Sequence, residues 1–89
     1  MKHFNITVYG KVQGVFFRQT ILEIANQLGI KGFVLNESNG NVYIEAEATE
    51  EQLSKLIEGS RKGPPGAVVS EVKVSEGEIK NFQAFSIKR

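Results

Sequence analysis

Residues 10–18, with the sequence GKVQGVFFR, combine the residue types that bind anions. An alternating strand pattern ends at Gly10, the backbone turns through Gly14, and a helical pattern then begins that includes Arg18. Backbone N–H groups and the helix dipole attract anions at a helix N-terminus, and Gly14 can take a positive φ that lets successive N–H groups converge. Arg18 adds a planar fork of donors that matches phosphate or carboxylate oxygens. We therefore predict a site for a tetrahedral oxyanion.

The position of Arg18 argues for this site against a simpler interpretation. A glycine pair such as Gly10 and Gly14 often makes only a tight turn, and the arginine after it can be a solvated residue. A cation in the first turn of a helix, however, opposes the helix dipole. Local rules of this kind tend to be broken where function requires it, which favours an anion between Arg18 and the helix.

The same stretch resembles the first signature of the acylphosphatase family, in Val8, Gly10 and residues 12–18 (VQGVFFR). Residues 32–36 (GFVLN), with Gly40 and Val42, resemble the second signature of that family. The resemblance continues through residues 63–67 (GPPGA) to Phe82, Phe85 and Ile87, so it spans nearly the whole chain.

This resemblance implies an enzyme that hydrolyses the carboxyl–phosphate bond of acyl phosphates, giving a carboxylate and inorganic phosphate without a cofactor. The implied phosphate-binding loop consists of Gln13, Gly14, Val15, Phe16, Phe17 and Arg18. Arg18 would clamp the phosphoryl group, and Asn36 would orient the attacking water through its side-chain amide. By itself, an Asn between a strand and a turn is usually structural. Inorganic phosphate would be both the product and a competitive inhibitor.

Some positions depart from the family pattern. Leu35 stands where a Lys or Arg is common, which removes a charge next to the site and predicts weaker steering of anionic substrates. Gly59 stands where a large apolar residue is frequent. Phe33, Ala48 and Ala84 are further departures, and none of the five replaces Arg18 or Asn36.

Length and composition exclude several classes of protein. The 89 residues suffice for one domain, residues 1–89, and contain no cysteine, so there is neither a disulfide nor a thiolate ligand. His3 is the only histidine and cannot build a metal site; we expect it to face solvent on a strand.

Eleven basic against ten acidic residues give a net charge of +1, without the basic stripe of a nucleic-acid binder. No apolar run approaches the roughly 20 residues of a membrane span. We expect a cytoplasmic monomer acting on a small molecule.

The order of elements follows from the periodicity of the apolar residues. Residues 3–9, 31–36 and 42–48 alternate as strands, and in the last of these Tyr43, Glu45 and Glu47 should point outward. The first helix should end at Gly29 and carry an apolar stripe of Phe17, Ile21, Ile24, Ala25 and Leu28.

The second half of the chain predicts one more helix and two more strands. Thr49 and Gln52 form a capping box that starts the second helix, which ends at residues 63–66 (GPPG). A fourth strand carries Val69, Val72 and Val74, whose uneven spacing indicates a bulge. A short closing strand should contain Phe82, Phe85 and Ile87.

This order predicts an α+β fold, a ferredoxin-like βαββαβ sandwich with two helices on one face of a mostly antiparallel sheet of four strands plus a short fifth. Acylphosphatases have this fold, but the fold alone hosts many functions. Two alternatives therefore stay open. The first is a non-catalytic module that binds phosphate or carbamoyl phosphate, like the acylphosphatase-like domain of larger carbamoyl-transfer maturation proteins. The second is RNA binding on the open sheet face, which the acidic residues of strand 42–48 disfavour.

Overall fold

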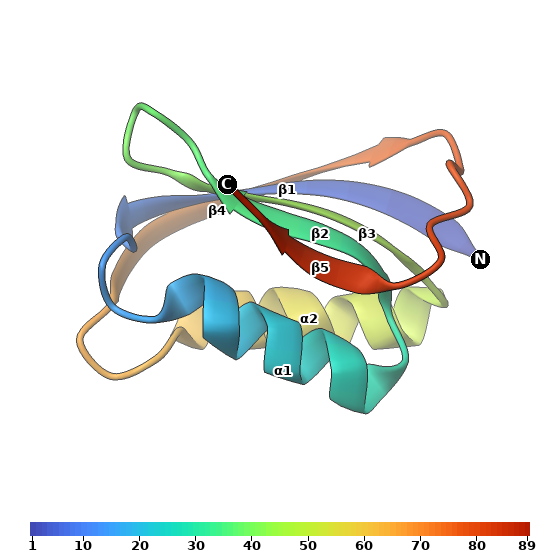
Figure 1. Ribbon diagram of the computed structural model, residues 1–89, viewed down its shortest axis with the longest axis horizontal. Coiled ribbons are helices and arrows are strands. Elements are labelled where there is room, and N and C mark those ends of the chain that lie inside the picture. Colours follow the sequence, from blue (N-terminus) through green and yellow to red (C-terminus); the bar gives the residue numbers. More distant parts are fainter.

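The computed structural model describes all 89 residues. They form one sheet that two helices cover on one face (Figure 1). Its elements are β1 (Lys2–Lys11), α1 (Phe17–Leu28), β2 (Lys31–Asn36), β3 (Val42–Ala48), α2 (Glu50–Lys62), β4 (Val68–Gly77) and β5 (Phe85–Lys88). The strand order is β4-β1-β3-β2-β5. All neighbours pair antiparallel except β2 and β5, which are parallel. The predicted ferredoxin-like sandwich is confirmed.

The main core lies between the helices and the sheet. Ile6 and Val8 of β1 and Ile44 of β3 are fully buried there, as the alternation of apolar residues predicts. From the helices, Phe17, Ile21, Ala25, Leu53 and Leu56 complete this core.

The start of α2 and the end of α1 lie at the predicted capping residues. The Thr49 hydroxyl accepts a hydrogen bond from the Gln52 backbone N–H, and the Gln52 side chain accepts one from the Thr49 N–H, so the capping box is present. Gly29 ends α1 with a φ of 72°. Neither helix is long and apolar enough to span a membrane.

The predicted bulge lies where β4 pairs with β1. Tyr9 pairs with Glu71 and Gly10 pairs with Val69, which leaves Ser70 as the extra residue. A Cβ atom at Gly10 would lie 2.1 Å from the Val68 carbonyl oxygen. Only glycine therefore allows the two strands to approach so closely at the point where the chain turns toward α1.

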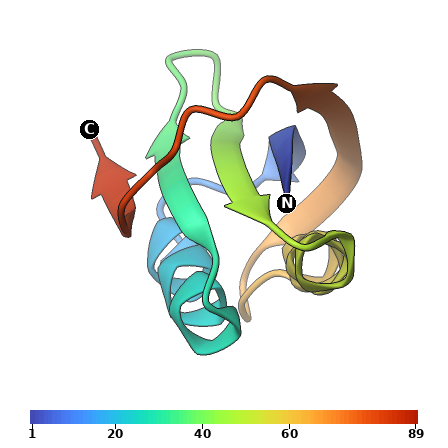
Figure 2. The ribbon, with the colours of Figure 1, turned by 90° about the vertical axis from the view of Figure 1, so that its right-hand side faces the viewer.

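The sheet face opposite the helices is not open to solvent along its whole length. Residues 78–84, here called the crossing segment, run from β4 to β5 on that side (Figure 2). His3, Glu45 and Glu47 lie beneath it and are buried. The expectations that His3 faces solvent and that the two glutamates point into it are therefore wrong, although the side on which the glutamates lie was predicted correctly.

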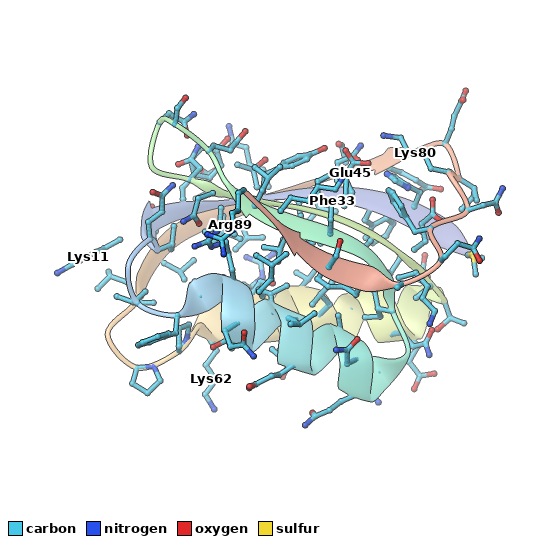
Figure 3. The ribbon with its side chains drawn as sticks, in the orientation of Figure 1. Lys11, Phe33, Glu45, Lys62, Lys80 and Arg89 are labelled. Atoms are coloured by element: carbon cyan, nitrogen blue, oxygen red, sulfur yellow. The ribbon has the colours of Figure 1, made fainter.

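Polar contacts hold the crossing segment on the sheet. The Lys80 ammonium donates a hydrogen bond of 2.8 Å to Glu45, and both residues are labelled on this face in Figure 3. Phe82 lies in the crossing segment, outside β5, and its ring packs 5.8 Å from the His3 ring and 5.7 Å from the Phe33 ring, measured between centroids. The prediction that Phe82 belongs to the closing strand is wrong, because this side chain covers the second face of the sheet.

Candidate active site

The loop between β1 and α1 has the backbone conformation expected of an anion-binding turn. Gly14 has a φ of 75°, as predicted. Phe16, the N-cap of α1, is also left-handed, with φ 63° and ψ 27°, and its side chain makes no cap hydrogen bond. A left-handed conformation is unfavourable for a bulky residue and occurs mainly at functional sites. The sequence did not predict this strain at Phe16.

The backbone N–H groups of the loop are free to bind a ligand. None of the N–H groups of residues 13–16 donates a hydrogen bond within the protein. The N–H groups of residues 17–19 belong to the first turn of α1, where no preceding carbonyl is available. The structure thus presents the row of donors that a tetrahedral anion requires.

Arg18 extends from the first turn of α1 into the space beside this loop. That turn contains no acidic residue to offset the helix dipole. Arg18 is half-buried, and its guanidinium forms no ion pair with any carboxylate of the protein. Both the helix terminus and the side chain therefore carry uncompensated positive charge.

Asn36 is the last residue of β2, where that strand pairs with Val42 of β3. Its side-chain oxygen Oδ1 is buried and accepts no hydrogen bond from any protein group. Buried polar atoms without a partner are rare and costly in native structures. An unpartnered Oδ1 beside a pocket is therefore suited to accept a hydrogen bond from a water molecule or a ligand.

Gln13 fixes the loop relative to Asn36. Its side-chain Nε2 donates hydrogen bonds of 2.8 Å to the Glu37 carbonyl and 2.9 Å to the Asn41 carbonyl, both in the turn that follows Asn36. The side chain thus ties the anion-binding loop to the β2–β3 turn. Gln13 does not itself line the pocket, so its side chain has a positioning role.

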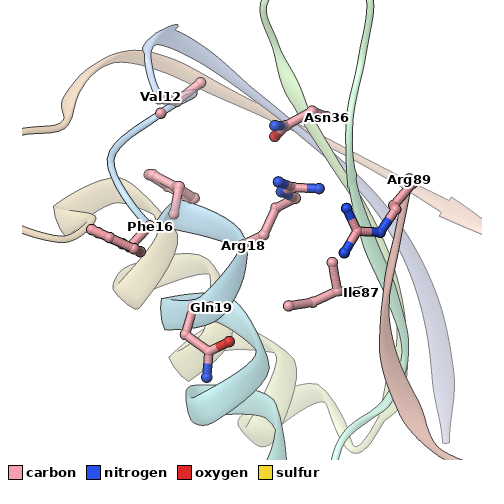
Figure 4. A pocket seen from close by; sticks show the side chains of 9 residues that line it. Val12, Phe16, Arg18, Gln19, Asn36, Ile87 and Arg89 are labelled. Carbon is pink, nitrogen blue, oxygen red and sulfur yellow. The ribbon is translucent and has the colours of Figure 1, made fainter.

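These elements enclose a pocket of about 370 Å³, lined by Val12, Gly14, Phe16, Phe17, Arg18, Gln19, Asn36, Ile87 and Arg89. Figure 4 shows the side chains of Arg18, Asn36 and Arg89 pointing toward one another, whereas Gln19 points away. The structure therefore brings together five of the seven predicted site residues, and leaves Gln13 and Val15 outside the lining. No acidic side chain lines the pocket.

Arg89 is a pocket residue that sequence reasoning missed. It follows β5, and it reaches the pocket because β5 pairs in parallel with β2, so both strands end at the same edge. Nothing in the local sequence reveals that pairing. The absence of a charge at Leu35 predicted weaker steering of anionic substrates, yet Arg89, just after the end of β5, adds a cation to the pocket.

The pKa values of Tyr43, Glu45 and Glu47 are displaced, and none of these residues lines the pocket. Burial, followed by the hydrogen bond to Glu45, raises the pKa of Tyr43 to about 12. Burial would raise the pKa of Glu45, but hydrogen bonds from Lys80 and Tyr43 outweigh it and hold this pKa below the ordinary value. The pocket itself is therefore built for charge stabilisation, without an evident acid–base pair.

The chain is similar to known proteins in both sequence and structure. A family model described as Acylphosphatase matches residues 4–87. An acylphosphatase of Ligilactobacillus salivarius is 47% identical over 89 residues, covering 98% of this chain and 98% of the relative. The crystal structure of acylphosphatase from Bacillus subtilis superposes with a TM-score of 0.97 at 33% identity, covering 100% of both chains. The structure of full-length HypF in its phosphate- and nucleotide-bound form superposes with a TM-score of 0.92 at 36% identity, covering 99% of this chain and 12% of HypF.

Proposed function

Because this chain belongs to the acylphosphatase family, we propose that it hydrolyses acyl phosphates in the pocket between the phosphate-binding loop, residues 13–18, and the ends of β2 and β5. The reaction splits the carboxyl–phosphate bond and yields a carboxylate and inorganic phosphate. A carboxylate is a good leaving group, so the reaction needs no strong general acid. The absence of acidic side chains from the pocket lining supports this assignment.

The first part of the proposed mechanism is the binding of the phosphoryl group. The free N–H groups of residues 13–18 cradle its oxygens, and the Arg18 guanidinium neutralises its charge. The transition state of phosphoryl transfer is loose and spreads charge over the equatorial oxygens, so positioning and electrostatic stabilisation supply most of the catalysis.

The second part is the attack of water. Asn36 Oδ1 accepts a hydrogen bond from a water molecule and aligns it with the phosphorus. The water oxygen bonds to phosphorus while the bond from phosphorus to the carboxylate oxygen breaks, and the carboxylate leaves with the electron pair. A phosphoryl oxygen of the substrate takes the proton of the water, since no acidic side chain lines the pocket to act as a base. The products are the carboxylate and inorganic phosphate.

One observation carries this proposal: the unpaired Arg18 guanidinium and the unpartnered Asn36 Oδ1 face the same pocket (Figure 4). The cation is suited to the dianionic phosphoryl group, and the amide oxygen is suited to a water molecule. A module that only binds phosphate would need the first of these groups and not the second.

The direct test is hydrolysis of benzoyl phosphate by the purified protein, followed as release of benzoate and phosphate. We expect turnover with benzoyl phosphate and little or none with phenyl phosphate, because phenoxide is a more basic leaving group than a carboxylate and departs slowly without a general acid, which the pocket lacks. Binding of phosphate without turnover of benzoyl phosphate would instead support the non-catalytic module.

Inorganic phosphate should occupy the same pocket as the substrate. We expect it to inhibit competitively and to raise the melting temperature, because it binds the native state and not the unfolded chain. At 100 times its Kd, phosphate would stabilise the fold by about 2.7 kcal/mol. Non-competitive inhibition would place the anion site elsewhere.

We further propose that residues 1–89 form a single domain that acts as a cytoplasmic monomer on small-molecule acyl phosphates. One hydrophobic core shared by both helices and the sheet supports the single domain. Sedimentation equilibrium of the purified protein, with activity measured across the same concentration range, tests the oligomeric state.

A further inference from the structure

The parallel pairing of β5 with β2 determines which way the last side chains of β5 point. Ile87 pairs with Val34, and Lys88 pairs with Leu35. Successive side chains of a strand alternate between the two faces of the sheet. Ile87 packs against the main core on the helix side, so Lys88 lies on the opposite face, where its Nζ is 4.3 Å from the centroid of the Phe33 ring.

Arg89 returns to the helix side and comes beside Asn36. The pairing of Leu35 with Lys88 makes Arg89 and Asn36 the next two residues along these strands. Arg89 lines the pocket together with Asn36 and Arg18, and Figure 4 shows its guanidinium directed toward that of Arg18. Two cations from different elements, α1 and the end of β5, thus face one pocket.

Neither guanidinium has a counter-ion in the protein. Ion pairs join Lys2, Lys55 and Lys80 to glutamates, and the His3 ring contacts two further carboxylates. None of these contacts includes either arginine of the pocket. No acidic side chain lines the pocket. Like charges that face each other repel, so this arrangement favours an anion with more than one negative charge between them.

We propose that Arg89 is a second substrate-binding cation, which contacts the phosphoryl group together with Arg18. This inference rests on the proposed function, because it assumes that the phosphoryl group occupies this pocket. The phosphoryl group of an acyl phosphate carries up to two negative charges, one for each guanidinium, and a guanidinium fork matches its oxygens. Arg89 is exposed to solvent, so its contribution should be smaller than that of the half-buried Arg18.

The test compares Arg89→Gln with Lys88→Gln. The two substitutions remove the same charge from adjacent residues on opposite faces of the sheet. They therefore distinguish the loss of a direct contact with the ligand from a change in the electrostatic field of the whole protein. For each variant we would measure kcat and KM for benzoyl phosphate and the inhibition constant of inorganic phosphate. Titration calorimetry with phosphate gives the same affinity without turnover, so a failure of the hydrolysis assay would leave this test intact.

We expect Arg89→Gln to raise KM and the inhibition constant of phosphate about tenfold, as for the loss of one solvent-accessible, charge-assisted hydrogen bond. Lys88→Gln should leave both values near those of the native protein, and Arg89→Lys should lie between because it keeps the charge and loses the fork. The melting temperature of Arg89→Gln should be unchanged. Equal effects of Arg89→Gln and Lys88→Gln would overturn the proposal. A rise in KM with an unchanged phosphate affinity would also overturn it, because Arg89 would then contact the acyl group.

Discussion

The Nδ1 atom of His3 lies 2.7 Å from Oε2 of Glu47, and each of these side chains is only 1% exposed. Glu47 also accepts hydrogen bonds from the backbone N–H groups of Lys80 and Phe82, in the crossing segment. One carboxylate on β3 therefore contacts a side chain of β1 and also holds the crossing segment on the sheet. The nitrogen Nε2 of His3 faces a second carboxylate, that of Glu45, at 3.1 Å.

Glu47→Gln should destabilise the fold while the residues of the pocket stay in place. The substitution removes the negative charge of the carboxylate that contacts His3. It also replaces one carboxylate oxygen with an NH2 group, which cannot accept a hydrogen bond from either backbone N–H group of the crossing segment. A buried hydrogen-bonding group left without its partner typically costs about 1–3 kcal/mol, and more where the group is charged. Urea denaturation should show this loss, whereas Glu50→Gln, at the exposed ion pair with Lys2, should change the midpoint far less.

The effect of Glu47→Gln should depend on pH. Burial would raise the pKa of Glu47, but hydrogen bonds from the Lys80 N–H, His3 and the Phe82 N–H outweigh it and hold the pKa below its ordinary value. A lowered pKa in the folded state means that the carboxylate stabilises the fold above the unfolded pKa of about 4.3, and that this contribution disappears as the pH falls through the folded value. The melting temperatures of the native protein and Glu47→Gln should therefore converge on acidification. A constant difference down to the acid range would contradict this role.

The buried His3–Glu47 pair shows where sequence reasoning stopped. Alternation of apolar and polar residues correctly placed Glu45 and Glu47 on the face away from the helices. It could not show that the crossing segment covers that face, because the cover comes from residues more than 30 positions away in the chain. The alternation of residues along a strand predicts on which face of the sheet a side chain lies. Whether that face is buried depends on tertiary packing.

In the pocket, too, residues within short sequence motifs were predicted, and a residue placed by distant strand pairing was missed. Gly14 and Arg18 were predicted from their local anion-binding chemistry, whereas Asn36 was predicted only from the resemblance of residues 32–36 to a family signature. Arg89 was missed because its place depends on the parallel pairing of β5 with β2. The left-handed conformation of Phe16 was also missed, since a phenylalanine gives no sequence signal for a positive φ.

Gln13→Ala should lower activity through a change in position. The two hydrogen bonds from Gln13 hold the anion-binding loop against the turn after Asn36. Misplacement of reacting groups by about 1 Å can cost on the order of 10²-fold in rate, so we expect a fall in kcat between about tenfold and that limit. Gln83→Ala is the matched control, because the Gln83 amide also donates to a backbone carbonyl but lies in the crossing segment, away from the pocket. Equal kcat values for the two variants would contradict a positioning role for Gln13.

Gly59→Ala should stabilise α2. Glycine within a helix costs about 1 kcal/mol relative to alanine. An added Cβ would lie 2.7 Å from Cδ1 of Ile24, the flexible end of a half-buried side chain that can shift. We expect a net gain of about 0.5 kcal/mol or more in the free energy of unfolding, with unchanged activity. Gly32→Ala is the contrasting case, because its Cβ would lie 1.9 Å from the Glu45 carbonyl oxygen and the φ is 147°; it should be strongly destabilising. A loss of stability in Gly59→Ala would show that Ile24 cannot give way.

Arg18→Ala should lose activity and phosphate affinity together. The guanidinium would bind the phosphoryl group in the ground state and in the transition state, so both kcat/KM and phosphate binding depend on it. Removing one donor to a developing charge typically costs about 10²–10³ in rate. Arg18 lies at the mouth of the pocket and outside the hydrophobic core, so the circular dichroism spectrum should be unchanged. Near-native turnover by a folded Arg18→Ala protein would refute the assignment of the clamp.

The contrast between Asn36 and Asn39 gives the most direct test of the mechanism. Asn36 Oδ1 has no partner in the protein, whereas Asn39 Oδ1 accepts a hydrogen bond of 3.1 Å from the Asn41 N–H within the turn. If Asn36 positions the water, its amide acts in the transition state and contributes little to phosphate binding. Asn39 should then contribute only to the conformation of the turn.

The decisive measurement is therefore steady-state hydrolysis of benzoyl phosphate by Asn36→Ala and Asn39→Ala, with the inhibition constant of phosphate determined for each. We expect Asn36→Ala to lower kcat by about 10²–10³, with KM and the phosphate inhibition constant nearly unchanged, and Asn39→Ala to retain most of its kcat. Normal turnover by Asn36→Ala, or an equal loss in Asn39→Ala, would contradict the proposal that Asn36 orients the attacking water.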